Sequence, residues 1–169
     1  MARIFGGVLE YTGRSGGLLY DPGVGSVLWR DAPYAHMGPL AVATSGMWRV
    51  ALAAPPSVWL RLSAHNDAAM ARVERHLGRG VVYLCTLGVE PSLAGKGHGS
   101  RLLRRALEEQ ARRWQTCVLR TEQPRNVPFY EKHGFERVED FVVPASGLRT
   151  WVFSRSLAGA QGAGRLETT

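Results

Sequence analysis

Apolar positions in the second half of the chain follow two periods, that of buried strands and that of a helix. Residues 81–89 (VVYLCTLGV) form a nearly unbroken apolar run, and residues 117–121 form a second one. Runs of this length are typical of strands that are buried on both faces. Between them, residues 100–114 carry apolar side chains at the spacing of one helix face. The helix positions are Leu103, Leu107, Ala111 and Trp114. The pattern therefore predicts a strand, a helix and a second core strand.

Shorter patterns on both sides predict further helices and hairpins. Residues 66–77 have helical periodicity and are followed by Gly78, which suits the end of a helix. Residues 126–133 predict a short helix that Gly134 closes. Hairpins are expected at residues 17–29 and 135–155, each around a turn rich in Pro and Gly.

The N-terminal third of the chain and its C-terminal end have weaker hydrophobic patterns. Residues 4–11 predict the end of a helix, and residues 32–62 predict short helices or ordered loops that cover apolar surface. The Gly- and Ala-rich residues 158–169 predict a disordered tail. We therefore expect a single α/β domain over residues 1–157, with a mixed sheet.

Composition and charge change this interpretation little. A length of 169 residues suits one domain, and the net charge of +7 favours an anionic partner. A genome that favours Arg would explain the charge equally well. The chain has no RNP-like or helix-turn-helix pattern, so we do not expect nucleic-acid binding.

Cysteines and apolar segments indicate the cellular compartment of the protein. Cys85 and Cys117 lie in apolar runs and have no metal-site spacing, so we expect reduced core thiols. The N-terminus lacks a secretory apolar region, and residues 37–60 are interrupted by Arg49 and a Pro pair. We expect a cytoplasmic protein without membrane or metal.

Residues 95–100 (GKGHGS), here called the glycine loop, predict an anion site. The loop follows a buried strand and opens a helix, so its backbone N–H groups and the positive end of the helix would face a ligand. Lys96 and Arg101 add full charges nearby. A pyrophosphate group fits such a site.

Three general classes of glycine turn compete for this loop. A dinucleotide-binding loop nearly fits, but residues 90–94 separate the strand from the first glycine, and too few strands follow. A P-loop does not fit, because Lys96 precedes Gly97 rather than Ser or Thr. A purely structural turn is the third possibility.

A fourth interpretation comes from a family resemblance. Residues 89–91 followed by 94–100 resemble the acyl-CoA loop of the GNAT N-acetyltransferase superfamily, although Ala94 stands where Gln or Arg is usual. Residues 126–135 (NVPFYEKHGF), here called the second signature, resemble the second motif of that family. The C-terminal half is similar in particular to puromycin-type N-acetyltransferases. The resemblance implies a GNAT-like, mostly antiparallel sheet flanked by helices, with acetyl-CoA as cofactor and a primary amine of a small molecule as acceptor.

The resemblance also implies roles for single residues. The backbone of Leu87 and Val89 would bind the pantetheine arm, and Tyr130 would be the general acid that protonates the leaving thiolate. Asn126 would hydrogen-bond the cofactor or cap its helix. The loop residues expected to hold the cofactor are Gly95, Lys96, Gly97, His98, Gly99 and Ser100.

The sequence leaves the identity of the general base undecided. Puromycin-type enzymes have a Glu at the position of Arg120, so the usual base is absent here. Glu122 and Glu90 lie near strand ends and are the alternatives, as is a chain of water molecules. His98 and His133 are expected to be structural or to face solvent. A non-catalytic acyl-CoA-binding or partner-binding module is the competing function.

The beginning of the chain differs from the family pattern. It starts within the second helix of a GNAT domain, so we expect the usual first strand and helix to be absent. A homodimer or another partner chain would then complete the sheet edge, unless the sequence begins downstream of the natural start. Aromatic side chains expected to line an acceptor pocket are Trp29, Tyr34, Trp48 and Trp59.

Overall fold

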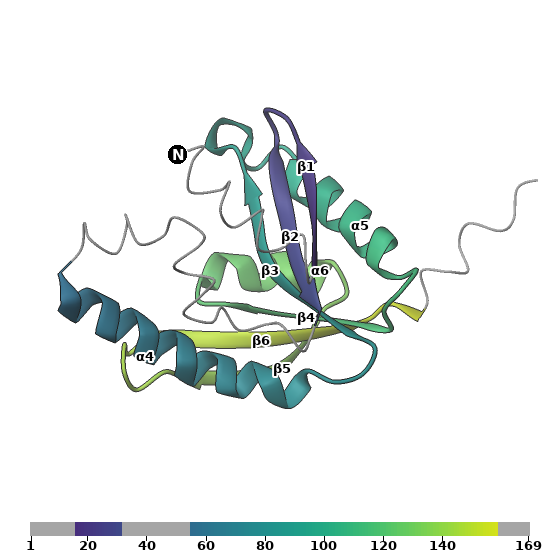
Figure 1. Ribbon diagram of the computed structural model, residues 1–169. Coiled ribbons are helices and arrows are strands. Elements are labelled where there is room, and N and C mark those ends of the chain that lie inside the picture. Colours follow the sequence, from purple (N-terminus) through teal and green to yellow (C-terminus); the bar gives the residue numbers. More distant parts are fainter. Residues whose placement is uncertain (1–15, 32–54, 159–169) are drawn as a thin grey trace, which may run out of the picture.

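The computed structural model describes residues 16–31 and 55–158, which form one six-stranded sheet with helices on both faces (Figure 1). The strand order is β1-β2-β3-β4-β6-β5. The strands are β1 (Gly16–Asp21), β2 (Gly25–Asp31), β3 (Val81–Val89), β4 (Thr116–Thr121), β5 (Glu136–Val142) and β6 (Arg149–Ser156). The α-helices are α4 (Pro56–Val73), α5 (His98–Gln110) and α6 (Val127–Lys132), and the 3-10 turns are η2 (Glu74–His76), η3 (Pro91–Leu93) and η4 (Pro124–Asn126).

The strand pairing confirms the expected mixed sheet. Strand β3 pairs with β4 in parallel, and every other neighbouring pair among the described strands is antiparallel. Helix α5 connects β3 to β4, as parallel neighbours require a crossover. Both predicted hairpins are present, as β1-β2 and β5-β6.

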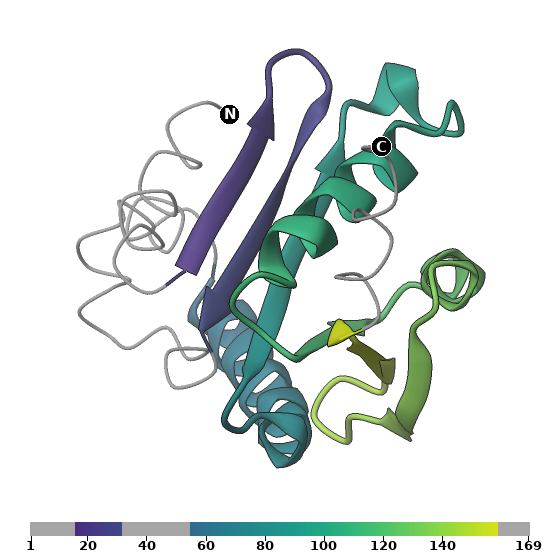
Figure 2. The ribbon, with the colours of Figure 1, turned by 90° about the vertical axis from the view of Figure 1, so that its right-hand side faces the viewer.

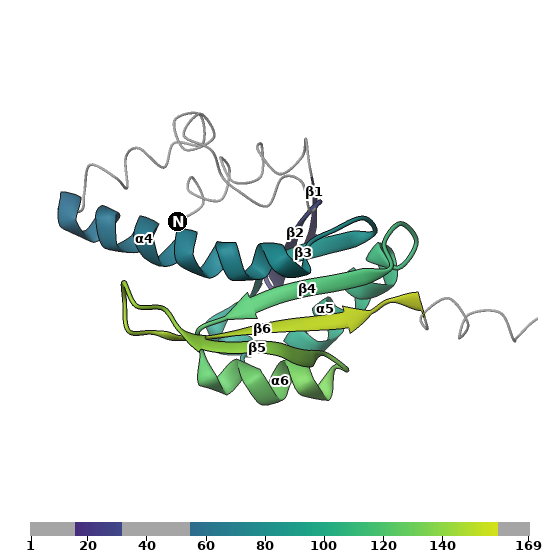
Figure 3. The same ribbon diagram turned by 90° about the horizontal axis from the view of Figure 1, so that it is seen from below.

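The helices divide between the two faces of the sheet (Figures 2 and 3). Helices α5 and α6 cover one face, where the main core includes Leu103 and Tyr130. Helix α4 covers the other face, where Val73 packs in a smaller core. Strand β4 contributes to both cores because successive side chains of a strand point to opposite faces of the sheet. Leu119 packs in the first core and Val118 in the second.

Helix α4 is longer at its N-terminal end than the sequence predicted. The expected helix at 66–77 starts instead at Pro56 and runs to Val73, followed by η2. The prediction was wrong because residues 56–62 were assigned, with the Ala-, Gly- and Pro-rich segment before them, to short helices or loops. Proline is favoured in the first helical turn, where its missing N–H has no intrahelical partner to lose. Residues 56–62, expected as short helices or loops, belong to this helix.

Helix α5 and strand β3 also differ from expectation in detail. Helix α5 covers His98–Gln110 rather than 100–114, so Trp114 lies beyond its end. Strand β3 has the expected bounds, but it is not buried throughout. Val82, Tyr83 and Leu84 are buried, whereas Thr86 is exposed. The expectation of full burial was wrong because β4 does not accompany β3 along its whole length.

Some predictions lie outside the described residues. They are the helix end at 4–11, residues 32–54 of the segment 32–62, and residues 159–169 of the expected tail. Strand β1 is an outer strand of the described sheet, and its completion by a partner stays a prediction. Cys117 is buried and Cys85 half-buried, and both are free thiols. None of the described helices combines the length and apolar character needed to cross a bilayer.

Candidate functional site

Strands β3 and β4 run side by side only at their beginnings, and this creates a gap in the sheet. Their register extends from Val81 opposite Thr116 to Leu84 opposite Leu119. Beyond Leu84, β3 stays paired with β2 but has no partner among the described strands on its other side. Figure 1 shows β3 and β4 diverging from this point.

The backbone of Leu87 and Val89 faces this gap. The Glu90 N–H donates to the Val24 carbonyl at 2.8 Å, so Glu90 points its N–H toward β2. Backbone groups in a strand alternate between its two sides, and the β2-β3 register is regular at this end. The N–H and C=O groups of Leu87 and Val89 therefore point away from β2 and are available to a ligand.

The glycine loop supplies a second set of free backbone groups. Gly95 and Gly97 have φ of 77° and 82°, a left-handed conformation that other residues adopt only with strain. Gly97 is the N-cap of α5, and its carbonyl accepts the first helical bond from Arg101 at 3.1 Å. The N–H groups of His98, Gly99 and Ser100 precede that bond, so they have no partner within the helix.

A cavity of about 650 Å³ joins the gap to the glycine loop. This volume lies within the range of small-molecule sites. A Cβ added at Gly95 or Gly97 would meet no protein atom within 4 Å, so the space beside the loop is open to a ligand. The lining residues predicted from the sequence are Leu87, Val89, Gly95, Gly97, Gly99, Ser100, Asn126 and Tyr130.

Positive charge surrounds the cavity. The N-terminal end of α5 carries a partial charge of roughly +0.5 from the helix dipole. Arg125 and Lys132 add full charges to the lining. Arg101 lies nearby, and its Nη2 is 3.5 Å from Asp21 Oδ2. The site therefore suits an extended anion with a neutral arm that reaches into the gap.

Tyr130 lies in α6 at the inner end of the cavity lining and is 7% exposed. Three aromatic rings surround it, with centroids at 5.3 Å for Phe129, 5.7 Å for Phe135 and 5.9 Å for Phe153. Burial, assisted by the nearby Cys117, raises the pKa of Tyr130 to about 12. The phenol therefore keeps its proton at neutral pH and can donate it.

Of the two roles predicted for Asn126, the structure does not show helix capping, and a contact with the cofactor stays a prediction. It occupies the N-cap position of α6, but its side chain makes no capping hydrogen bond. Instead, Nδ2 donates to Thr121 Oγ1 at 3.1 Å, and the residue lines the cavity. The geometry favours a ligand contact over helix capping.

Several predicted site residues lie outside the cavity lining. Lys96 is exposed, and His98 Nδ1 lies 3.3 Å from Arg101 Nη2. Glu90 is exposed and outside the lining as well. His133 Nδ1 contacts the Phe129 carbonyl at 2.7 Å, which fits the structural role expected for it.

The expected aromatic acceptor wall is not found among the residues whose side chains are described. Trp29 is buried, 7% exposed, and packs in the core, so it was wrongly expected to line a pocket. Gly17 lies directly over its ring, where a Cβ would come within 2.4 Å of Cζ2. Tyr34, Trp48 and the side chain of Trp59 lie outside the described residues.

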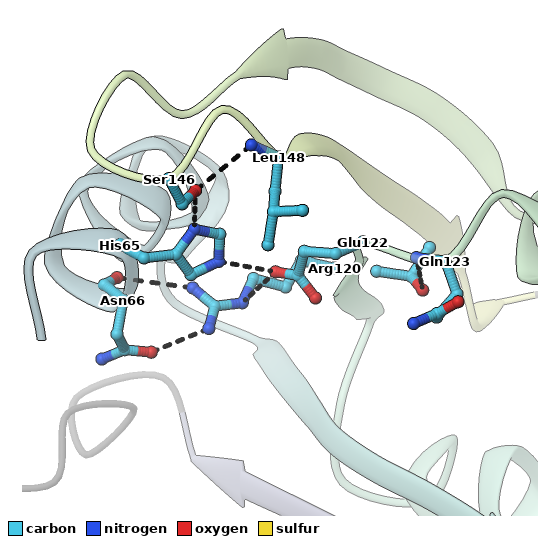
Figure 4. A network of polar contacts seen from close by, with 8 residues as sticks. His65, Asn66, Arg120, Glu122, Gln123, Ser146 and Leu148 are labelled. Atoms are coloured by element: carbon cyan, nitrogen blue, oxygen red, sulfur yellow. Dashed lines mark hydrogen bonds and ion pairs between the residues drawn. The ribbon is translucent and has the colours of Figure 1, made fainter. Parts of the chain in front are cut away.

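Glu122 is not part of the cavity lining and belongs to a polar network with side chains of α4 (Figure 4). Its Oε1 is 3.5 Å from His65 Nε2 and 3.3 Å from Arg120 Nε. Arg120 Nη2 in turn donates to Asn66 Oδ1 at 2.7 Å, and His65 Nδ1 lies 2.7 Å from Ser146 Oγ. No local sequence pattern indicates His65 and Ser146, because 81 positions separate them.

A comparison with known families finds a match in the middle of the chain. Residues 56–137 match the family model of the acetyltransferase (GNAT) domain. The matched GNAT segment contains α4, β3, the glycine loop, α5, β4 and α6. The segment therefore carries the diverging strands and the cavity lining together.

Solved structures support the GNAT fold. One protein described as a GNAT-family acetyltransferase, from Desulfovibrio desulfuricans, matches with a TM-score of 0.52 and 12% identity over 88% of this chain and 74% of that chain. At this identity the match shows the fold alone.

Shorter matches include an acetyltransferase structure from Agrobacterium tumefaciens, with 26% identity, a TM-score of 0.43 and coverage of 47% of this chain and 59% of that chain. The ribosomal-protein-S18-alanine N-acetyltransferase from Escherichia coli matches with 17% identity and a TM-score of 0.42, over 48% of this chain and 57% of that chain. In both cases this chain spans less than two thirds of the other protein.

Proposed function

We propose that this protein binds acetyl-CoA in the glycine-loop cavity and transfers the acetyl group to the primary amine of a small molecule. The observation that carries this proposal is the divergence of β3 from β4. It leaves the backbone groups of Leu87 and Val89 facing a cavity that also contains the glycine loop and Tyr130. The match of residues 56–137 to the GNAT domain supports the same class of reaction.

The residues present fit the parts of acetyl-CoA. The free N–H groups at the start of α5 suit a pyrophosphate, because they combine donors with the positive end of a helix. Leu87 and Val89 offer one donor and one acceptor each to the amides of a pantetheine arm. Ala94 adds no side-chain contact, so the loop would bind mainly through its backbone. Acetyl-CoA would supply the thioester whose acetyl group is transferred.

Acetyl transfer to an amine requires two proton movements. The new C–N bond replaces the C–S bond, so the leaving sulfur needs a proton and the attacking ammonium must first lose one. Tyr130 lines the cavity and holds its proton at neutral pH, which supports it as the general acid. Glu122 is outside the cofactor cavity and lies on the α4 face. It would therefore act from the acceptor side.

Acetyl-CoA and a panel of primary amines, with thiol release and product mass measured together, test the proposal. We expect amine-dependent thiol release above the rate of hydrolysis, with an increase of 42 Da in the amine, the mass of an added acetyl group. Calorimetry with CoA is the companion measurement. Binding of CoA without turnover of any amine would instead indicate the non-catalytic acyl-CoA-binding module, for which the replacement of the usual Glu by Arg120 is the motivating observation.

A further inference from the structure

A second cavity, of about 380 Å³, lies on the α4 face of the sheet. It is lined from α4 and from the turn before β6, and it shares no lining residue with the glycine-loop cavity. Three of its lining side chains are aliphatic and three are polar or charged. They are Val58, Leu62, Leu148, Arg61, His65 and Ser146.

The polar side of this cavity is a hydrogen-bonded chain (Figure 4). Ser146 Oγ lies 2.7 Å from His65 Nδ1 and accepts a hydrogen bond from the Leu148 N–H at 3.2 Å. An ionised carboxylate only accepts, so Nε2 of His65 carries its proton toward Glu122. Nδ1 is then the acceptor for the Ser146 hydroxyl proton. Ser146 Oγ keeps one lone pair for a ligand in the cavity.

One carboxylate oxygen of Glu122 is buried without a hydrogen bond from the residues described. Its Oε1 is shielded from solvent and makes no hydrogen bond within the described part of the chain, although His65 and Arg120 lie within ion-pair distance. A buried carboxylate oxygen without a hydrogen bond is costly. A positive charge on His65 would strengthen its contact with Glu122 and reduce that cost. Glu122 is therefore placed to orient the His65 ring and to offset a positive charge on it.

We propose that this second cavity binds the apolar part of a primary amine and that Ser146, His65 and Glu122 together remove the proton from its ammonium group. The proposal rests on the acetyl transfer proposed above and names the acceptor class and the base for it. The ammonium proton passes to Ser146 Oγ while the Ser146 hydroxyl proton passes to His65 Nδ1. Glu122 then faces an imidazolium, and the neutral amine keeps the lone pair for attack.

The lining also selects among amines. Val58, Leu62 and Leu148 are each about half exposed, so they have apolar surface left to cover. Arg61 lies in the same lining, and a second cationic centre on the acceptor would be repelled there. The charged groups around His65 are Glu122 and Arg120 from the end of β4 and Arg61 from α4. The geometry therefore favours an apolar monoamine over a polyamine.

Substitution of His65 tests the proton path with 2-phenylethylamine as acceptor. We expect His65→Gln to lower kcat at pH 7 by about a hundredfold or more, the range of general base catalysis, with little change in KM. The loss should shrink as pH rises toward the range in which the free amine is already neutral. Ser146→Ala should behave similarly, and Ser146→Thr should retain most activity because it keeps a hydroxyl.

His76→Gln is the matched control for His65→Gln. His76 Nε2 also contacts a carboxylate, Glu139 Oε1 at 3.0 Å, but it lies outside this cavity lining. An equal loss of kcat in both variants, or an unchanged kcat and pH profile in His65→Gln, would overturn the proton path while leaving acetyl transfer intact. Absence of turnover by the wild-type protein with every amine would contradict the proposed function itself.

Binding of the amine gives a readout that does not depend on turnover. Leu62→Trp would fill the cavity, and Leu60→Trp is its control, because Leu60 is 73% exposed on the same helix and outside the lining. In calorimetry with CoA present, we expect Leu62→Trp to weaken 2-phenylethylamine at least tenfold and Leu60→Trp to leave it unchanged. Equal affinity in the two variants would show that the amine binds elsewhere.

Discussion

At the scale of single residues, Tyr130 shows how packing would keep the proposed proton donor protonated. The aromatic rings around it exclude water, and burial raises its pKa to about 12. A raised pKa favours the protonated phenol, so the donor form persists throughout neutral and mildly alkaline pH.

Tyr130→Phe removes the hydroxyl and keeps the ring. We expect kcat to fall by about a hundredfold, since a positioned acid typically contributes 10²–10⁴. The affinity for CoA and the thermal midpoint should change little, because the aromatic contacts remain. Steady-state kinetics and calorimetry measure the two effects separately. An unchanged kcat would remove Tyr130 from the acid role.

Residues within one short motif could be predicted from the sequence, and residues joined only by the fold could not. Tyr130 and Asn126 belong to the second signature, and both line the cavity. His65 lies in a different helix from that signature and meets Ser146 and Glu122 only after α4 packs on the sheet. No local pattern records such a contact, so this candidate base was missed.

At the scale of elements, the start of α5 combines an unusual backbone with a charged helix end. Gly97 adopts φ of 82° at the N-cap, which aims the first N–H groups at the cavity. The sequence predicted this loop from its glycines but placed the start of the helix two residues later. The prediction of α4 was less accurate, because the effect of Pro55-Pro56 depends on whether a helix ends or begins there.

Gly97→Ala tests the loop conformation. We expect a loss of about 1–2 kcal/mol in the free energy of unfolding, because a Cβ is strained at this φ. CoA affinity should also fall, since the loop would shift to relieve the strain. Gly23→Ala is the control, because Gly23 has φ of 73° and equally open surroundings in the β1-β2 turn. It should lose similar stability in urea titration and keep the affinity of the wild-type protein. A CoA affinity unchanged in Gly97→Ala would contradict the role of the loop.

At the scale of the whole molecule, the sheet has a core on each face and a gap beyond Leu84, where β3 and β4 no longer pair. The glycine-loop cavity is lined from β3, α5 and α6, and the second cavity is lined from α4 and the turn before β6. The order of strands and helices was predictable from the hydrophobic pattern. The divergence of β3 from β4 could not be predicted from that pattern, because pairing register depends on contacts between distant segments, and only the family resemblance implied it.

Phe153→Ala tests the contribution of the larger core to the stability of the whole fold. Phe153 is fully buried in β6 and contacts the ring of Tyr130, so we expect a loss of about 3–5 kcal/mol in the free energy of unfolding. Val142→Ala, at a side chain that is 56% exposed, should cost far less. Denaturant titration measures both. A small loss of unfolding free energy in Phe153→Ala would show that neighbouring side chains can move in to fill the cavity left by the ring.

The divergence of β3 from β4 also has a thermodynamic consequence. Under the proposed binding, acetyl-CoA would occupy the position beside β3 that a strand would otherwise take. The cofactor would then stabilise the fold as well as take part in the reaction. A ligand that binds only the folded chain adds stability by mass action, about 2.7 kcal/mol at a hundred times its Kd. The folded fraction of the protein would then increase and decrease with the concentration of acetyl-CoA. The stability of the protein would therefore depend on the metabolic state that supplies its substrate.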